Sequence, residues 1–278
     1  MTTSGKRSRG VRRALGALLM AALRQRASPL DDEELGRSAV VFSPHFDDET
    51  LGCGGTILRK RALGADVSIV FLTDGRASHR DWINEAELTR VRAREGLAAA
   101  KALGVSEARV HRLGFEETRL RSCADEAVAR VREILHSVAP EQVFVPYRFE
   151  PPEDHAATFE IARRAITSHG QPVSVYEYPI WVWAQWPWAA LPERPPGELP
   201  RLLVRQWRTL RRFLGDFRSR VEIADVRAGK HQALEKHRSQ LFRPPDQPDW
   251  PILADVTGGD FLDCFFHDFE LFARRLSE

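Results

Sequence analysis

Residues 38–55 read SAVVFSPHFDDETLGCGG, and this stretch predicts the fold. Its first six residues are mostly apolar, as in a short buried strand, and residues 50–63, followed by Gly64, have the pattern of a helix. The loop between them holds one histidine and three acids. A buried strand that leads through a short loop into a helix is typical of a parallel α/β sheet.

The alternation of strands and helices continues along the chain. Further strands are expected at residues 66–73, 109–113, 142–145, 173–180 and 220–225. Helices are expected at residues 86–103, 123–138, 154–168 and 228–240. Helices of this length between strands imply right-handed crossovers. We therefore predict an α/β fold, a Rossmann-like three-layer αβα sandwich with a mainly parallel sheet.

Two polar clusters follow predicted strands. The first is PHFDDE at 44–49, and the second is EPPEDH at 150–155. Ligands of open parallel sheets bind outside the carboxyl ends of the strands, so both loops are expected at one sheet edge. Two imidazoles and one carboxylate, His45, Asp48 and His155, have the composition of a catalytic zinc site with a free fourth position. The alternatives are acids that cap a helix N-terminus and a surface histidine.

A dinucleotide site is the competing interpretation of the same region. Residues 52–55 are glycine-rich, and Asp74 lies about 20 residues on, where a ribose-binding acid is expected. However, Ile57 stands in place of the third glycine, and three acids at 47–49 would repel a pyrophosphate. We therefore disfavour nucleotide binding.

The two motifs resemble a known family. PHFDDE at 44–49, followed by LGCGG at 51–55, is similar to the PHPDDE signature of the LmbE-like (PIG-L) family of zinc-dependent N-acetylglucosamine de-N-acetylases. The similarity extends over residues 38–168, with a weaker match at 230–240. It implies that His45, Asp48 and His155 bind Zn²⁺ or another divalent metal, and that Asp47 acts as general base on zinc-bound water. The implied reaction removes an N-acetyl or other N-acyl group from an amino sugar or glycoconjugate.

The sequence departs from the family pattern at two positions. Phe46 replaces the proline of the first motif, and Pro152 replaces the first histidine of a His-Pro-Asp-His motif, which in the family is thought to assist the oxyanion. We expect His237 to take over that catalytic role; the alternative is an exposed histidine on a basic helix. A protein that lost activity with this histidine, and serves as a carbohydrate-binding or scaffold protein on the same fold, is the alternative function.

Substrate-binding residues are expected near the motifs. Positions that match the family's substrate cleft are Arg76, Arg92 and Glu117, for which the alternative is solvated charges or local ion pairs. Trp183 belongs to a tryptophan cluster at 181–188 that is suited to stacking on a saccharide, or else packs as a lid on its own core. The expected partner is an N-acetylated sugar or glycoconjugate carried on a large or anionic group, and the oligomeric state is left open.

Composition adds a segregation of charge. The chain has 278 residues, 43% hydrophobic and 29% charged, which excludes a disordered or collagenous protein. Its net charge is +2, but residues 1–30 hold seven basic residues and no acid, which leaves 34 basic and 39 acidic residues in the remainder. We expect a basic N-terminal arm with an acidic link (1–36) and one domain (37–278) with a Trp/Pro-rich lid insertion at about 181–218.

The arm and the insertion suggest a membrane contact. Residues 14–23 are uncharged and mostly apolar behind Arg12 and Arg13, which fits a disordered leader, a surface-lying anchor or a cleaved export signal. Residues 201–214 predict a basic amphipathic helix with the apolar stripe Leu203, Trp207, Leu210 and Leu214. Peripheral contact with an anionic membrane through residues 1–28 and 201–214 is expected, and nucleic acid is not. Three cysteines without a CxxC pair favour a reducing compartment, the cytoplasm, with possible membrane association.

Overall fold

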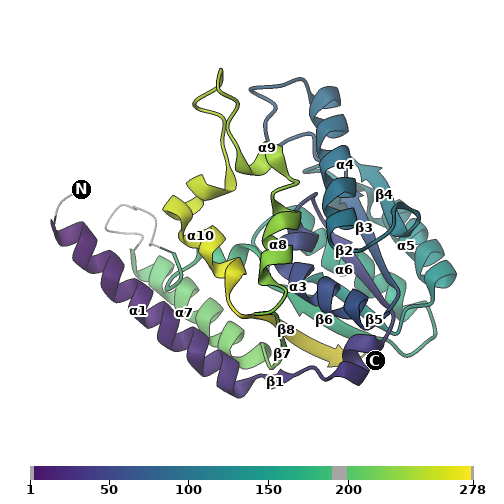
Figure 1. Cartoon of the computed structure of the whole chain (residues 1–278), viewed down its shortest axis with the longest axis horizontal. Helices are drawn as coiled ribbons and strands as arrows, with labels where there is room; N and C mark the ends of the chain where they lie inside the picture. The colour runs from purple at the N-terminus through teal and green to yellow at the C-terminus, as the bar shows by residue number, and fades with distance from the viewer. Residues whose placement is uncertain (1–2, 190–198, 277–278) are drawn as a thin grey trace.

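The computed structural model describes residues 3–189 and 199–276 of the chain. It shows an eight-stranded sheet with helices on both faces (Figure 1). The strands are β1 (Ser28–Pro29), β2 (Ala39–Ser43), β3 (Val67–Thr73), β4 (Val110–Phe115), β5 (Gln142–Pro146), β6 (Ser174–Tyr178), β7 (Ser219–Glu222) and β8 (Phe269–Leu276). The longer helices are α1 (Thr3–Arg26), α3 (Asp48–Ala62), α4 (Glu85–Ala102), α5 (Ala124–Val138), α6 (Glu153–Thr167), α7 (Leu199–Asp216) and α8 (Arg227–Leu234).

The strand order is β1-β7-β8-β6-β5-β2-β3-β4. Strand β2 lies in the interior of the sheet, pairing in parallel with β3 and β5, and only β8 runs antiparallel to its neighbours β6 and β7. The predicted α/β sandwich with a mainly parallel sheet is confirmed. Because β2 and β5 are adjacent and parallel, the loops that follow them lie at the same sheet edge.

The sheet separates two hydrophobic cores. Successive side chains of a strand point to opposite faces, and β2 follows this rule. Val41 joins the core under α3 and α8, whereas Val40 and Phe42 join the core under α5 and α6. A strand that is buried on both faces has to be apolar throughout, which explains the uninterrupted run at 39–42.

The C-terminal part differs most from the prediction. The expected helix at 228–240 is interrupted: α8 ends at Leu234, and the short α9 (Arg238–Leu241) begins only after His237. Strand β8 was not predicted, and it fills the sheet between β6 and β7. Both of its neighbours in the sheet come earlier in the sequence. The remaining short elements are α2 (Asp32–Gly36), α10 (Asp260–Asp263) and the 3-10 turns η1 (Glu107–Arg109), η2 (Leu120–Cys123), η3 (Trp181–Ala184), η5 (Leu253–Gly259) and η6 (Cys264–Phe266).

The N-terminal segment is a docked helix and not a separate arm. Met20 and Leu23 of α1 are buried in the same core as α3 and β8. Arg12 donates hydrogen bonds to the carboxylate of Asp260 and to the backbone carbonyl of Trp188. Arg24 pairs with Glu222 at 2.7 Å. Of the three alternatives for this segment, a disordered leader does not agree with the contacts of Arg12, Met20, Leu23 and Arg24.

The described parts of the insertion at 181–218 also pack into the main core. The ring of Trp183 lies 5.0 Å from that of Trp188 and 4.9 Å from that of Phe213, both edge to face. Most of the proline-rich part, residues 190–198, lies outside the described residues. In the part of the chain that the structure describes, none of the helices combines the length and apolar character needed to cross a membrane.

Helix α7 is amphipathic, but its buried stripe agrees with the predicted one only at Leu210 and Leu214. The buried side chains include Leu202, Leu210 and Phe213, whereas Leu203 and Trp207 are exposed. Both sets have helical spacing, so the sequence pattern did not determine which set faces inward. Packing of Phe213 between Trp183, Trp188 and Phe217 determines the rotation of the helix.

Candidate metal centre and active site

The turn between β2 and α3 places three functional side chains. Asp47 has a φ of 126°, a region that L-residues rarely adopt because of steric strain. Two acids stabilise this turn: the Asp48 Oδ2 atom accepts the N–H of His45 at 3.1 Å, and the Glu49 Oε2 atom accepts the N–H of Asp47 at 3.0 Å. The acids at 48 and 49 therefore shape the loop as well as lining it.

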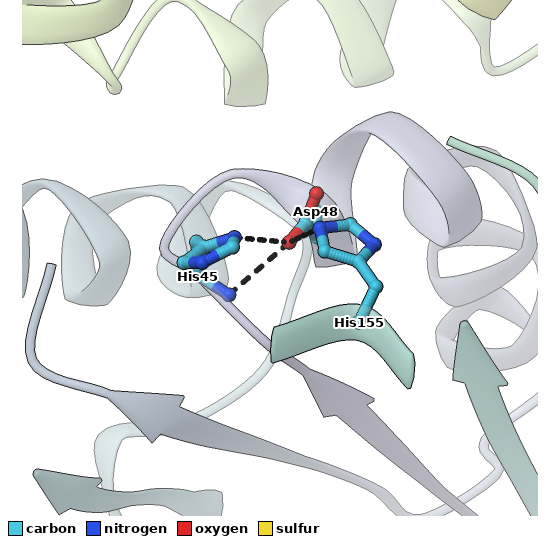
Figure 2. Close-up of side chains that lie close together, drawn as sticks. All are labelled: His45, Asp48 and His155. Carbon is cyan, nitrogen blue, oxygen red and sulfur yellow. Dashed lines mark hydrogen bonds and ion pairs between the residues drawn. The ribbon is translucent and has the colours of Figure 1, made fainter. Parts of the chain in front are cut away.

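The structure brings His45, Asp48 and His155 together, as the sequence predicted (Figure 2). Nδ1 of His45 lies 3.2 Å from Oδ2 of Asp48, and Nε2 of His155 lies 3.3 Å from the same oxygen. One possible ligand atom from each residue lies within 4.8 Å of the others. His45 comes from the β2 loop, Asp48 from the first turn of α3 and His155 from the first turn of α6.

The donor set fits a metal ion. His155 is completely buried, and apart from the ion-pair contact of Nε2 with Asp48 neither of its ring nitrogens has a hydrogen-bond partner in the described structure. A buried polar atom without a partner costs about 1–3 kcal/mol, so such atoms call for a ligand. Two imidazoles and a carboxylate directed at one point are suited to a divalent cation. His45, Asp48 and His155 thus form a group able to hold a metal ion.

Charges at this point are strongly coupled. Burial by itself raises the pKa of Asp48, but the neighbouring His155 and His45 outweigh it and hold that pKa far below its usual range. Burial likewise lowers the pKa of His45, but hydrogen bonds to Asp154 and Asp48 raise it to about 10. Asp48 is therefore a carboxylate in the folded protein, the form that binds a cation.

Two acids that the sequence prediction did not assign hold the histidines in place. Oδ2 of Asp154 lies 3.3 Å from Nε2 of His45 and accepts the N–H of Thr118 at 2.7 Å. Oε2 of Glu150 lies 3.9 Å from Nδ1 of His155. Both acids belong to the cluster at 150–155. Their position in the sequence close to His155 was the signal that could have assigned them this role. Carboxylates behind ligand histidines orient the rings and increase their basicity.

Glu150 is fixed by backbone groups. Its carboxylate accepts the N–H of Ile180 at 2.8 Å and that of Trp181 at 2.6 Å, and its side chain is buried. Burial raises the pKa of Glu150 to about 7, although His155 and the two N–H groups act in the opposite direction. The segment after β6 therefore helps to position His155 through Glu150.

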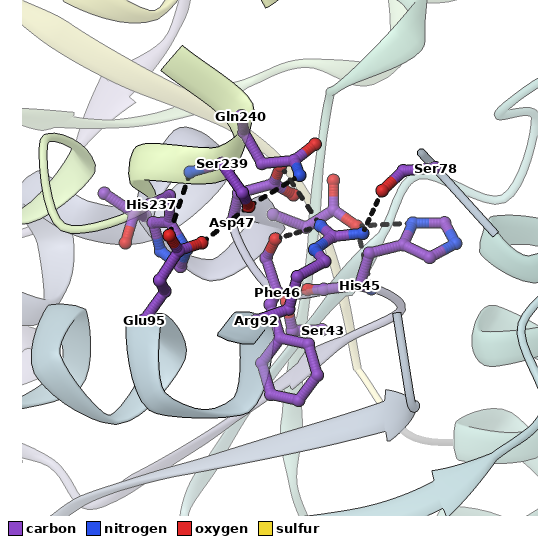
Figure 3. A network of polar contacts seen from close by, with 12 residues as sticks. Ser43, His45, Phe46, Asp47, Ser78, Arg92, Glu95, His237, Ser239 and Gln240 are labelled. Carbon is purple, nitrogen blue, oxygen red and sulfur yellow. Dashed lines mark hydrogen bonds and ion pairs between the residues drawn. The ribbon is translucent and has the colours of Figure 1, made fainter. Parts of the chain in front are cut away.

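Asp47 lies beside the triad in a polar network that also includes His45 (Figure 3). It is buried, and its Oδ2 atom lies 3.5 Å from Nη2 of Arg92, which also donates a hydrogen bond to the carbonyl of Phe46. Burial raises the pKa of Asp47 to about 7, in spite of the opposing charge of Arg92. A carboxylate with a pKa near neutrality suits the exchange of protons.

His237 is also buried, so the alternative of an exposed histidine is wrong. Its Nε2 atom lies 3.0 Å from Oε1 of Glu49, and both side chains are completely buried. Through the other oxygen of Glu49, His237 is connected to the backbone of Asp47. Its Nδ1 atom has no hydrogen-bond partner in the described structure. The role of His237 toward the oxyanion stays a prediction.

The four expected substrate residues fall into three groups. Glu117 lies in the site, with Oε1 3.7 Å from Nε2 of His45 and 4.0 Å from Nη1 of Arg92, so Glu117 and Arg92 are both brought to the ligands. Arg76 is partly exposed and pairs with Asp74 at the edge of this network. Trp183 is only 4% exposed within the core, which leaves no ring face for a sugar and argues against the expected stacking role.

The comparisons with known proteins agree with this geometry. Residues 40–166 match the model of the GlcNAc-PI de-N-acetylase (PIG-L) family. A diacetylchitobiose deacetylase of Thermococcus kodakarensis is 32% identical over 141 residues, which are 49% of this chain and 51% of the relative. The chain thus spans about half the length of this curated relative.

Solved structures extend the likeness beyond the matched segment. The N,N'-diacetylchitobiose deacetylase of Pyrococcus horikoshii aligns over 95% of this chain and 92% of its own, with a TM-score of 0.64 and 20% identity. A teicoplanin deacetylase, described in a zinc-inhibited form, aligns over 73% of this chain and 85% of its own, with a TM-score of 0.54 and 19% identity. At these identities the likeness shows the fold.

Proposed function

We propose that the protein is a metal-dependent N-deacetylase, because residues 40–166 match the model of the GlcNAc-PI de-N-acetylase (PIG-L) family. The reaction would hydrolyse the N-acetyl or another N-acyl amide of an amino sugar or glycoconjugate. The observation that carries this proposal is the convergence of His45, Asp48 and His155 beside the buried carboxylate of Asp47. The resident metal is proposed to be zinc.

His45, Asp48 and His155 would hold the ion, and Asp154 and Glu150 would keep the two rings oriented. A bound Zn²⁺ supplies a Lewis acid that polarises the amide carbonyl and lowers the pKa of a water molecule toward about 7. The chain itself supplies the proton transfers. Asp47, whose pKa lies near 7, would take a proton from the attacking water and deliver one to the leaving amine.

Arg92 keeps Asp47 ready for this role. Its guanidinium is buried and lies between the Asp47 carboxylate, at 3.5 Å, and the Glu117 carboxylate, at 4.0 Å. The positive charge limits the rise in the pKa of Asp47 that burial causes. We propose that Arg92 and Glu117 border the bound sugar, that Arg76 contacts it from the edge, and that His237 supports the developing oxyanion in place of the histidine that Pro152 replaces.

The proposed substrate is an N-acetylhexosamine linked to a larger group. The relative from Thermococcus kodakarensis is named for diacetylchitobiose, and the structural neighbour from Pyrococcus horikoshii for N,N'-diacetylchitobiose. The proposal also includes a reducing compartment, since Cys53, Cys123 and Cys264 are free. We also propose that residues 1–28 and 201–214 make a peripheral contact with an anionic membrane.

The deciding experiment combines metal analysis with amine release. Purified protein is expected to hold about one divalent metal per chain and to release amine from N-acetylglucosamine-containing substrates such as N,N'-diacetylchitobiose. Zn²⁺ should be added up to stoichiometry and then in excess, because one structural neighbour is described as zinc-inhibited. A protein that binds sugars and metal without amine release from any acylated sugar tested would support the alternative, a binding or scaffold protein. Absence of metal binding would refute the enzyme proposal.

A further inference from the structure

Helices α1 and α7 lie on the same side of the molecule (Figure 1). Helix α1 leads into β1 and α7 leads into β7, and these two strands pair in parallel, with Ser28 opposite Ser219. Both helices also pack on Trp188: Arg12 of α1 donates to its backbone carbonyl, and the Phe213 ring of α7 lies 4.8 Å from its indole. The two outer helix faces are therefore neighbouring parts of one side of the protein.

Exposed apolar side chains are concentrated on these two helices. Nine large hydrophobic side chains are exposed in the described part of the chain, and five of them lie on α1 and α7: Val11, Leu18, Leu203, Val204 and Trp207. Between Val11 and Leu18 the exposed positions of α1 are Arg13, which pairs with Asp260 and Asp263, and two alanines, and two more alanines follow at 21 and 22. Leu18 is 69% exposed and Trp207 is 63% exposed, so neither packs in the core.

The same two helices carry an excess of positive charge. Together α1 and α7 contain twelve Lys and Arg residues and one acid, which leaves 29 basic and 38 acidic residues in the remainder. Arg12, Arg13 and Arg24 are used internally, in ion pairs with acids of the domain. Four arginines of α7 are exposed, Arg201, Arg208, Arg211 and Arg212, and none of them forms an ion pair with a described residue. The guanidinium of Arg212 lies over the ring of Phe149, 4.2 Å from its centroid. Among the described residues, the other three have no acidic partner.

We infer that the outer faces of α1 and α7 form a surface that docks on an anionic lipid membrane. Exposed aliphatic and tryptophan side chains flanked by arginines are suited to the interface between headgroups and acyl chains, where helices lie in the membrane plane. Each unpaired arginine adds attraction to anionic headgroups. Nucleic acid fits less well, because it offers nothing to the aliphatic side chains and is repelled by the acidic remainder. This inference does not depend on the proposed deacetylase activity.

The structure changes the anchoring residues that the sequence suggested. Leu210 and Phe213 face the core, so the lipid-facing set on α7 is Leu203, Val204 and Trp207. On α1, Arg12 and Arg13 hold the helix to the domain, and Val11 and Leu18 face outward. The helix pair would therefore bind a membrane with the domain already folded, without release of either helix.

Cosedimentation of the full chain with vesicles tests this surface. Binding is expected to phosphatidylcholine vesicles that contain phosphatidylglycerol, and to weaken steeply with added salt. Neutralising two arginines (Arg208→Gln with Arg211→Gln) should weaken binding about 30-fold, because each charge near an anionic surface contributes about fivefold. Trp207→Ser should weaken it about tenfold or more through loss of buried apolar area.

The matched control is Leu63→Ser, which removes an exposed apolar side chain at the end of α3 and should leave binding unchanged. Melting temperatures close to that of the wild type would show that all variants fold, and amine release in detergent-free solution would be unaffected. The inference is overturned if the wild type does not bind the anionic vesicles, or if Arg208→Gln with Arg211→Gln binds like the wild type. It is also overturned if the apolar faces are covered in a dimer that Trp207→Ser dissociates, or if oligonucleotides bind and vesicles do not.

Discussion

Oδ2 of Asp47 lies 3.5 Å from Nη2 of Arg92, and both side chains are buried. The guanidinium also binds the carbonyl of Phe46, so it holds the backbone just before the strained residue. Asp47 is thus the acid of the loop 44–49 that faces a buried guanidinium, whereas Glu49 faces the imidazole of His237. Its neighbour Asp48 points instead at two imidazoles. The adjacent carboxylates of Asp47 and Asp48 therefore differ in chemical environment, because they face different partners.

Asp47→Asn should lower the turnover number for amine release by about 10²- to 10⁴-fold, the range expected for loss of a general base. Metal content should stay at the wild-type level, because the three ligands are intact. Metal analysis and initial rates on one preparation measure both quantities. Asp66→Asn, which changes an acid that is 65% exposed, serves as the matched control. Unchanged turnover in Asp47→Asn would remove Asp47 from the mechanism.

Glu150→Gln should weaken metal binding about 10- to 100-fold, as is usual when the group behind a ligand histidine is altered. The substitution keeps the shape of the side chain but removes the negative charge 3.9 Å from Nδ1 of His155. Competition with a coloured chelator gives the affinity. Glu160→Gln on the exposed face of α6 is the control and should bind metal like the wild type. Equal affinities for the two variants would contradict the role given to Glu150.

His237→Gln should lower the free energy of unfolding by about 3 kcal/mol near neutral pH, because it leaves Glu49 buried without its charged partner. Burial lowers the pKa of His237, but Glu49 outweighs this and raises it above the ordinary 6.5. The folded state therefore holds the proton more tightly than the unfolded state does. The contribution of this ion pair is complete between the ordinary pKa values of Glu49 and His237, 4.5 and 6.5, and declines as the pH rises through the raised pKa of His237.

Urea unfolding of wild type and His237→Gln over a pH series, with chelator present, measures this difference. The difference should also decrease toward acid pH. Burial raises the pKa of Glu49, but His237 outweighs it and holds that pKa below the ordinary 4.5. His231→Gln is the control, since His231 is 60% exposed beside Glu235. A wild-type advantage that grows steadily above pH 6.5 would show that the charged pair is not its source.

Gly52→Ala should destabilise the fold by about 1–3 kcal/mol through overpacking. A Cβ atom at Gly52 would lie 2.3 Å from Cδ2 of Tyr178, a side chain held by its hydrogen bond to the carbonyl of Phe42. Gly10→Ala in α1 has nothing within 4 Å of the new methyl group and should stabilise by up to about 1 kcal/mol. Urea midpoints for both variants suffice. Equal urea midpoints for the two variants would mean that α3 and Tyr178 can move apart without a loss of stability.

The convergence of the three candidate metal ligands was predictable because it depends on local order. His45, Asp48 and His155 each lie directly after a strand or in the first turn of a helix, and neighbouring parallel strands bring such positions to one edge. The strands themselves were predictable from apolar runs. The resemblance to the PIG-L family then gave each residue a chemical role, which the packing of Asp47 against Arg92 supports.

The contacts that the sequence did not reveal join distant segments. Arg12 binds Asp260 across 248 positions, and His237 binds Glu49 across 188. Charge counting showed a basic segment and an acidic remainder, but not that the two would pair. For Trp183, aromatic character fits a core and a sugar site equally well, and only the neighbouring rings decide between them.

The central position of β8 has a consequence for synthesis on the ribosome. Residues 269–276 emerge after both strands that they join, so β6 and β7 present unpaired edges while the chain is still being made. The loops that carry His45, Asp48 and His155 are complete by residue 155, more than 100 residues earlier. The nascent chain therefore holds its candidate metal ligands before its sheet is closed, and an ion bound at that stage would favour the native arrangement of β2 and β5.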